Sequence, residues 1–214
     1  MTAREDSPAR SAPDALREDK RALRRRLLDA RKARSDDDRA AATAALTRHV
    51  LALAGGVDGP VCCYLPVGPE PGAAGSGTST VADALLAAGH EVLAPVVPAE
   101  PGPLDWTRYE GSDALVTGPL GVREPGGERL GVDAIARAGL VLVPALAVDG
   151  RGRRIGRGGG YYDRTLPAVP ASTPLAVLLH DDELVDHVPA GDLDVTVAQV
   201  ILPTRGAVAV RNNL

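Results

Sequence analysis

The spacing of apolar residues predicts two helices at the start of the chain. Over residues 16–34, apolar side chains recur at intervals of three, four or seven, and the rest of this segment is strongly basic. This pattern is typical of a helix with one apolar stripe. Ser35 and Asp38 have the spacing of a capping box, so a second helix is expected to begin there. The paired glycines Gly55 and Gly56 predict its end.

Beyond residue 56 the pattern changes to short apolar runs that alternate with helix-like segments. The runs cover 61–65, 91–97, 140–148, 175–179 and 198–203, and the helix-like segments cover 80–89 and 132–139. Continuous apolar runs indicate strands buried on both faces, and their alternation with helices favours a mainly parallel sheet covered on both sides. The expected fold class is α/β. Pro95 and Pro144 are unfavourable inside central strands and predict that those runs kink or end there.

The start of the chain and its composition restrict the class of protein. Residues 1–14 mix acidic, basic and proline residues, which predicts a disordered tail before a single domain over 15–214. No run approaches the roughly 20 apolar residues that span a bilayer, so we expect a soluble, cytoplasmic protein without a membrane partner. The neighbouring Cys62 and Cys63 are expected to be small core residues in a reducing compartment.

Charge argues against a nucleic-acid partner, although the first helix is basic. The formal net charge is −4, and aromatic residues make up 2% of the chain. Proteins that bind single-stranded nucleic acid combine positive charge with aromatic stacking platforms, which this chain lacks. Any site for an anion must therefore be local.

The stretch "DGRGRRIGRGGGYYDRTL" (149–166) concentrates glycine and arginine after a predicted buried strand. Glycine lets backbone N–H groups approach an anion closely, and arginine presents planar donors that match phosphate oxygens. The stretch differs from two familiar phosphate-binding patterns, because no lysine follows its glycines and Tyr161 occupies the third glycine position of a dinucleotide fingerprint. We interpret it as another kind of phosphate-binding loop.

Asp163 is the one carboxylate within residues 151–164. An acidic group beside bound phosphates would repel them unless a divalent cation lay between, and magnesium is commonly held by one or two carboxylates plus substrate phosphates. Asp163 is therefore a candidate magnesium ligand. The alternative is a solvated, flexible loop in which Asp163 pairs with an arginine.

The segment "RRIGRGGGYYDR", preceded by "LVLVPALAVDGRG", resembles the signature of the 5-formyltetrahydrofolate cyclo-ligase family. Four further segments resemble elements of that family in the same order, so the likeness extends from about residue 20 to 204. They are "KRALR" (20–24), "YLPVGPEPG" (64–72), "GVREP" (121–125) and "VPAGDLDVTVAQVILPT" (188–204). The resemblance implies a three-layer α/β/α sandwich with a mainly parallel sheet, related to ribose-5-phosphate isomerase and CoA-transferase folds.

The same resemblance implies an ATP- and magnesium-dependent reaction that converts 5-formyltetrahydrofolate into 5,10-methenyltetrahydrofolate, ADP and phosphate. ATP would phosphorylate the formyl oxygen, and the resulting imidoyl phosphate would lose phosphate when N10 closes the ring. By resemblance, the ATP-binding residues are Lys20, Arg21, Arg24, Arg154, Ile155, Gly156, Arg157, Gly158, Gly159, Gly160, Tyr161 and Tyr162. Arg157, Gly158, Gly159, Gly160 and Tyr161 would also form the catalytic segment and contact the folate.

The remaining implied roles concern the folate and the metal. Leu65 and Glu70 would bind folate, with Glu70 hydrogen-bonded to N10 or a neighbouring ring N–H unless it is a solvated loop acid. Trp106, the single tryptophan, would stack on the pterin unless it simply packs in the core. Asp163 and Asp194 would hold magnesium.

One departure from the family pattern lies near Glu70. Relatives usually place a threonine three residues after this glutamate, whereas Ala73 stands here and "AAGSG" is inserted. The cap of the next helix is therefore expected at Thr78, Ser79 or Thr80. Two other functions stay open: a paralogue that binds ATP or another phosphorylated ligand without cyclising folate, and a sugar-phosphate isomerase. We expect a monomer.

Overall fold

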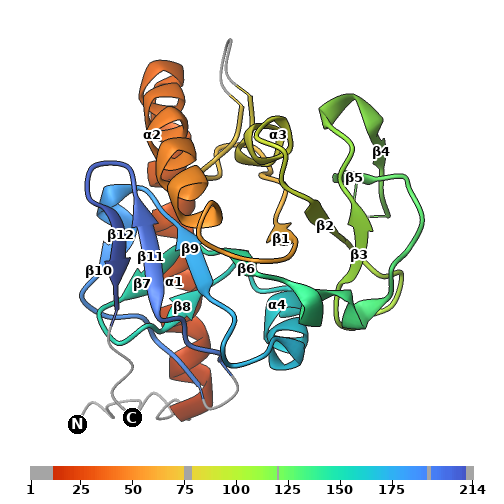
Figure 1. The fold of residues 1–214 in the computed structure, drawn as a ribbon. Coiled ribbons are helices and arrows are strands. Elements are labelled where there is room, and N and C mark those ends of the chain that lie inside the picture. The colour runs from red at the N-terminus through yellow and green to blue at the C-terminus, as the bar shows by residue number, and fades with distance from the viewer. Residues whose placement is uncertain (1–11, 75–78, 120, 192–193, 211–214) are drawn as a thin grey trace, which may run out of the picture.

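A seven-stranded sheet forms the centre of the protein in a computed structural model that describes residues 12–74, 79–119, 121–191 and 194–210 (Figure 1). The strands stand in the order β12 (Gly206–Ala209), β11 (Gln199–Leu202), β9 (Leu175–Leu178), β6 (Leu140–Pro144), β1 (Val61–Cys63), β2 (Val92–Val96) and β3 (Asp105–Arg108). The five inner strands pair in parallel, and β12 and β3 are antiparallel edges. Each predicted apolar run supplies one inner strand, which confirms the α/β class.

One face of the sheet is covered by α2 (Asp36–Ala54) and α3 (Val81–Ala87) (Figure 1). The Ser35 side chain accepts a hydrogen bond from the Asp38 N–H at 3.1 Å, so α2 begins where the sequence predicts. Thr80 caps α3 and exchanges hydrogen bonds with Asp83 in a full capping box. The cap expected at residue 78, 79 or 80 is therefore Thr80.

The other face is covered mainly by 3-10 helices. These are η2 (Val132–Arg137) and η3 (Leu166–Ala168), which follows the short helix α4 (Tyr161–Thr165). The helix expected over 132–139 is thus a 3-10 helix that begins after Gly131 and ends before Ala138. The helical layer predicted for this face is present, but it consists of short segments and not of long α-helices.

The two neighbouring cysteines show why the inner strands read as continuous apolar runs. Cys63 packs under α2 and α3, and Cys62 packs on the opposite face with Leu93 and Val141. Both thiols are free and buried, as predicted for core residues. Burial raises the pKa of Cys62 to about 12 and raises that of Cys63 further.

Helix α1 (Ala12–Ala33) packs on a small second sheet in which β7 (Ala147–Asp149) pairs with β8 (Arg154–Ile155) and β10 (Leu184–Val185). Because α1 begins at Ala12, residues 12–14 are helical and not part of a tail; the rest of the predicted tail, 1–11, lies outside the described residues.

The two prolines behave differently. The apolar run 140–148 divides at Pro144, where β6 ends, as predicted. Pro95 does not end β2, because the pairing of β2 with β1 stops at Leu93 and a missing N–H beyond that point is tolerated.

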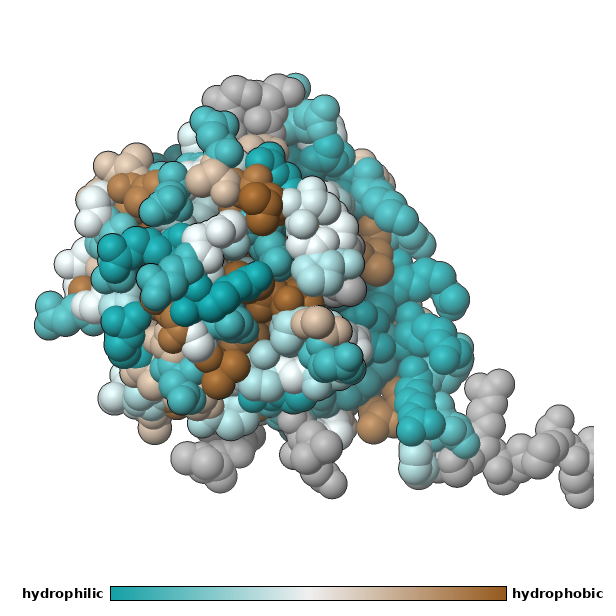
Figure 2. All heavy atoms as spheres, turned by 90° about the vertical axis from the view of Figure 1, so that its right-hand side faces the viewer, coloured by the Kyte–Doolittle hydropathy of each residue, from teal (hydrophilic) through white to brown (hydrophobic). Residues whose placement is uncertain are grey.

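The remaining elements lie beside β3, on the side of the molecule that Figure 2 faces. They are η1 (Ser112–Ala114) and the antiparallel hairpin of β4 (Leu115–Thr117) and β5 (Arg123–Pro125). A further 3-10 helix, η4 (Asp181–Glu183), lies elsewhere in the chain and directly precedes β10. Figure 2 shows hydrophobic surface near the centre of this side, bordered by hydrophilic side chains. Within the described residues, no helix has the length and apolar character that crossing a membrane requires.

Candidate functional site

A cavity of about 530 Å³ opens at the carboxyl ends of β1, β2 and β6. Open α/β sheets bind ligands at this edge, where the loops that follow parallel strands meet. Its walls come from those loops, from α1, from β5 and from the segment between β8 and α4. Most of the sequence-predicted residues line it: Lys20, Arg24, Leu65, Glu70, Arg154, Ile155, Gly156, Arg157, Gly158, Gly159, Gly160, Tyr161, Tyr162, Asp163 and Asp194.

The glycine loop presents bare backbone to one end of this cavity. Gly158 and Gly160 have φ values of 104° and 67°, a region that side-chain-bearing residues rarely adopt. Within the described part of the chain, the N–H groups of Gly158, Gly159 and Gly160 donate to no other group. Unpaired amides at the wall of a cavity are suited to bind an oxyanion.

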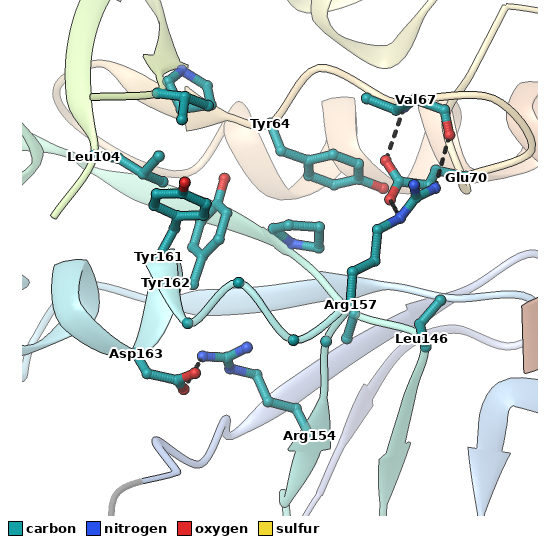
Figure 3. A pocket seen from close by; sticks show the side chains of 18 of the residues that line it. Tyr64, Val67, Glu70, Leu104, Leu146, Arg154, Arg157, Tyr161, Tyr162 and Asp163 are labelled. Carbon is teal, nitrogen blue, oxygen red and sulfur yellow. Dashed lines mark hydrogen bonds and ion pairs between the residues drawn. The ribbon is translucent and has the colours of Figure 1, made fainter. Parts of the chain in front are cut away.

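Arg154 projects from β8 beneath this loop and is only 6% exposed (Figure 3). Its guanidinium donates to Asp163 at 2.5 Å, while its buried Nε has no hydrogen-bond partner among the described residues. Burial lowers the pKa of Arg154, although the charges of Asp163 and Asp194 oppose the shift. An unsatisfied buried donor of this kind fits a phosphate oxygen better than an apolar ligand.

Helix α1 contributes two cations to the same end of the cavity. Lys20 Nζ lies 2.5 Å from Asp194, and Arg24 Nε donates to the Gly156 carbonyl at 2.9 Å. Burial would raise the pKa of Asp194, but hydrogen bonds from Lys20 and from the Gly191 N–H outweigh burial and lower it. Asp194 is therefore held as a carboxylate.

Arg21 does not reach the cavity, contrary to the sequence-based assignment. It is exposed and pairs with Glu18 at 2.9 Å. Lys20 and Arg24 are four residues apart and share one helix face, whereas Arg21 is rotated by about 100° from Lys20.

Glu70 lies on the loop after β1 and faces the glycine loop (Figure 3). One carboxylate oxygen accepts from the Val67 N–H at 2.8 Å, and the other lies 2.8 Å from Arg157 Nε. Arg157 also donates to the Val67 carbonyl at 3.0 Å. Glu70 is 9% exposed, so it is not a solvated loop acid. The insertion expected nearby covers residues 73–77, of which 75–77 lie outside the described residues.

The other end of the cavity is largely apolar. Tyr161 and Tyr162 stand side by side at the start of α4, near Leu104 and across from Tyr64 (Figure 3). The Tyr162 hydroxyl is buried and has no partner among the described residues. Aromatic and aliphatic walls with few polar atoms suit a planar ring system. Apolar residues elsewhere along the cavity are Val67, Pro95, Val97, Val122, Pro144, Ala145 and Leu146, of which Leu146 lies beside Arg157 (Figure 3).

Trp106 does not line the cavity, so stacking of its indole on a pterin is incorrect for this structure. It is fully buried and packs in the core cluster with Ile135 and Leu93. Its place on β3 directs the ring toward the face beneath η2, which leaves no ring surface exposed to a ligand.

Several lining residues were missed from the sequence, among them Tyr64, Leu104 and Glu124. Tyr64 directly follows β1, so the preference of ligands for the carboxyl ends of parallel strands could have identified it. Glu124 lies within the "GVREP" segment that resembles a family element. Leu104 gives no local signal, because packing between distant segments brings it to the cavity.

The possible metal ligands are two carboxylates. Among the described residues, no group of three or more His, Cys, Asp or Glu side chains could hold a metal ion. Asp163 and Asp194 both line the cavity, and the charges of both act on Arg154. Magnesium is usually bound by one or two carboxylates plus substrate phosphates, so this pair fits a magnesium–nucleotide complex. The pairing of Asp163 with Arg154 also matches the alternative considered from the sequence.

Known proteins resemble this chain over most of its length. A profile of the 5-formyltetrahydrofolate cyclo-ligase family matches residues 16–203. A 5-formyltetrahydrofolate cyclo-ligase of Mycolicibacterium smegmatis is 43% identical over 155 residues, which cover 71% of this chain and 77% of the relative. One from Escherichia coli K12 is 32% identical over 130 residues, covering 60% of this chain and 71% of the relative.

A solved structure shares the fold. The NMR structure of Aquifex aeolicus 5,10-methenyltetrahydrofolate synthetase superposes with a TM-score of 0.71 at 22% identity, covering 91% of this chain and 94% of the other. At that identity the likeness establishes the fold alone. The profile match over residues 16–203 and the 43% identity with the Mycolicibacterium smegmatis relative show that the chain belongs to the 5-formyltetrahydrofolate cyclo-ligase family.

Proposed function

We propose that this protein converts 5-formyltetrahydrofolate into 5,10-methenyltetrahydrofolate, using ATP and magnesium and releasing ADP and phosphate. The observation that carries the proposal is one cavity with two chemically different ends. Unpaired amides and the buried Arg154 offer donors for phosphates at one end, and Tyr161, Tyr162 and Leu104 offer an apolar wall at the other. Family membership supplies the folate substrate class.

The reaction needs activation of an unreactive group. A formyl group on N5 is an amide, and N10 cannot expel its oxygen as hydroxide. Transfer of the γ-phosphoryl group of ATP to the formyl oxygen gives an imidoyl phosphate and ADP. N10 then attacks the formyl carbon, the carbon–oxygen bond breaks, phosphate leaves and N10 loses its proton. No nucleophilic side chain is required.

Phosphoryl transfer demands alignment and positive charge around the phosphate oxygens more than covalent participation. In this chain Arg154 and the N–H groups of Gly158–Gly160 would hold the phosphates from below, and Lys20 and Arg24 would approach them from α1. Arg157 reaches from the glycine loop to the loop that carries Glu70, which supports a role for it in contacting both substrates.

Asp163 and Asp194 would hold magnesium, which supplies positive charge to the β- and γ-phosphate oxygens when bound. In the structure these carboxylates pair with Arg154 and Lys20. If the two carboxylates bound magnesium in place of these partners, Arg154 and Lys20 would be free to contact phosphate. Glu70 would accept a hydrogen bond from N10 or a neighbouring ring N–H, because Val67 and Arg157 already fix its carboxylate at the cavity wall.

The proposal extends to the whole chain. We propose a cytoplasmic monomer in which the chain from residue 12 onward forms a single domain, related in fold to ribose-5-phosphate isomerase and CoA-transferases. The competing function is a paralogue that binds ATP without cyclising folate, and the departure at Ala73, close to Glu70, is the feature that favours it.

Incubation of purified protein with 5-formyltetrahydrofolate tests the proposal directly. The near-ultraviolet absorbance of 5,10-methenyltetrahydrofolate should rise only when ATP and magnesium are both present. Reactions that lack either component, and a reaction with chelator, serve as controls. Binding of ATP without any absorbance change would favour the paralogue.

A further inference from the structure

Glu124 is a buried carboxylate in the apolar end of the cavity, and neither the nucleotide nor the metal assignment uses it. It lies on β5 opposite Val116 of β4, and its side chain is 7% exposed. It lines the cavity together with Val122 and Arg123 of the same segment and with Pro95 and Val97 from the end of β2. A carboxylate among apolar walls is costly unless it has hydrogen-bond donors.

The protein fixes this carboxylate without using all of its acceptor capacity. The Val97 N–H donates to one oxygen at 3.1 Å, and Arg129 lies 3.6 Å from the other, beyond ordinary hydrogen-bond length. An ionised carboxylate can accept about four hydrogen bonds. The two contacts hold the group in place and leave acceptor positions for a ligand.

The backbone beside Glu124 is shaped to admit the carboxylate. A Cβ added at Gly118 would lie 2.4 Å from the Glu124 carboxyl carbon and within 2.7 Å of both oxygens. A side chain at position 118 would therefore displace the carboxylate. Gly118 keeps space for an acidic group that points away from bulk water.

We propose that Glu124 determines specificity for the pterin by accepting hydrogen bonds from its 2-amino group and N3–H. This inference rests on the proposed function, because it assigns the apolar end to the pterin. The two pterin donors are adjacent and nearly parallel, so they match the two oxygens of one carboxylate. The phosphates lie at the other end of the cavity, which keeps this acidic group away from their charge.

The Glu124→Gln variant tests the assignment, with Glu128→Gln as the matched control. Glutamine preserves the shape and an acceptor for Val97, but it places an NH₂ group against the pterin donors. Glu128 is exposed, lies four residues away and does not line the cavity. The probes are 5-formyltetrahydrofolate and its 2-desamino-2-methyl analogue, titrated by calorimetry without ATP. A separate ATP titration verifies that each variant is folded.

For the wild-type protein and Glu128→Gln, 5-formyltetrahydrofolate should bind roughly 10- to 100-fold more tightly than the analogue, as expected for a hydrogen-bonded charged group. Glu124→Gln should lose that preference, through weaker binding of the natural folate, while its ATP affinity is unchanged. Unaltered folate affinity, or an equal loss for both folates, would overturn the inference.

The same measurements separate this inference from the proposed function. If the wild-type protein shows the Glu124-dependent preference but forms no methenyl product, the cyclo-ligase activity is wrong and the pterin contact stands. If the wild-type protein forms product and Glu124→Gln retains its KM for the folate, the activity stands and the contact is wrong.

Discussion

Helix α1 is anchored by a buried ion pair, and breaking that pair should destabilise the protein strongly. Arg31 and Glu183 are 1% and 2% exposed, and their two hydrogen bonds measure 2.7 and 2.9 Å. Arg31 also donates to the Ala145 carbonyl at 2.6 Å, and Glu183 accepts from the His180 N–H at 3.0 Å. Burial would lower the pKa of Arg31, but the hydrogen bonds and charge of Glu183 outweigh burial and raise it.

The expected magnitude follows from which groups lose their partners. Arg31→Met leaves the Glu183 carboxylate buried and unpaired, and Glu183→Leu leaves the guanidinium unpaired; each should lower the free energy of unfolding by about 3–5 kcal/mol. The double variant buries no lone charge. The Ala145 carbonyl and the His180 N–H then lose these partners, so its loss should be about 2–6 kcal/mol, below the sum of about 6–10 kcal/mol for the two single losses.

Urea denaturation followed by far-ultraviolet circular dichroism measures these differences. Arg21→Met is the control on the same helix, because it breaks the exposed pair with Glu18 and should cost about 1 kcal/mol or less. The reasoning is refuted if either single variant loses less than about 1 kcal/mol, or if the double variant loses the sum of both.

Three further outcomes concern the site and its surroundings. Arg154→Ala should raise the Kd for ATP roughly 10- to 100-fold in calorimetry, and unchanged affinity would remove this residue from the phosphate site. Asp163→Asn should raise the magnesium concentration needed for half-maximal activity, so an unaltered magnesium titration would exclude it as a ligand. Burial first, then the charges of Arg34 and Arg31, lower the pKa of His180 from 6.5 to about 4. The unfolded chain therefore takes up this proton at higher pH than the folded one, and stability should fall by about 3 kcal/mol between pH 7 and pH 4. His180→Asn should lack that part of the slope in urea titrations, and an identical slope would contradict the assignment.

Local pattern predicted the inner sheet well and its edges poorly. Strands β1, β2, β6, β9 and β11 are buried on both faces, which produces the continuous apolar runs. The edge strand β3 reads "DWTR", so no apolar run marks it, and β12 reads "GAVA", an apolar stretch for which no strand was predicted. The apolar periodicity of 132–139 predicted a helix there but not its 3-10 geometry.

In the site too, local sequence pattern predicted some residues and missed others. Residues that are close in sequence, such as those of the glycine loop and the Lys20–Arg24 pair, line one cavity as expected because one segment brings them together. Arg21 could have been excluded from the helical period. Trp106 was misassigned because the rarity of an aromatic residue says nothing about the face to which its strand directs it. Leu104 and Glu124 required knowledge of tertiary packing.

The reactivity of Cys62 and Cys63 can report which covering layer leaves the sheet when the protein opens. They occupy successive positions on β1, and each thiol faces a different covering layer. A water-soluble thiol reagent can reach Cys63 only when α2 and α3 leave the sheet, and Cys62 only when the 3-10 layer leaves. The order in which mass spectrometry detects the two modified cysteines would therefore show which layer detaches first, without any engineered label.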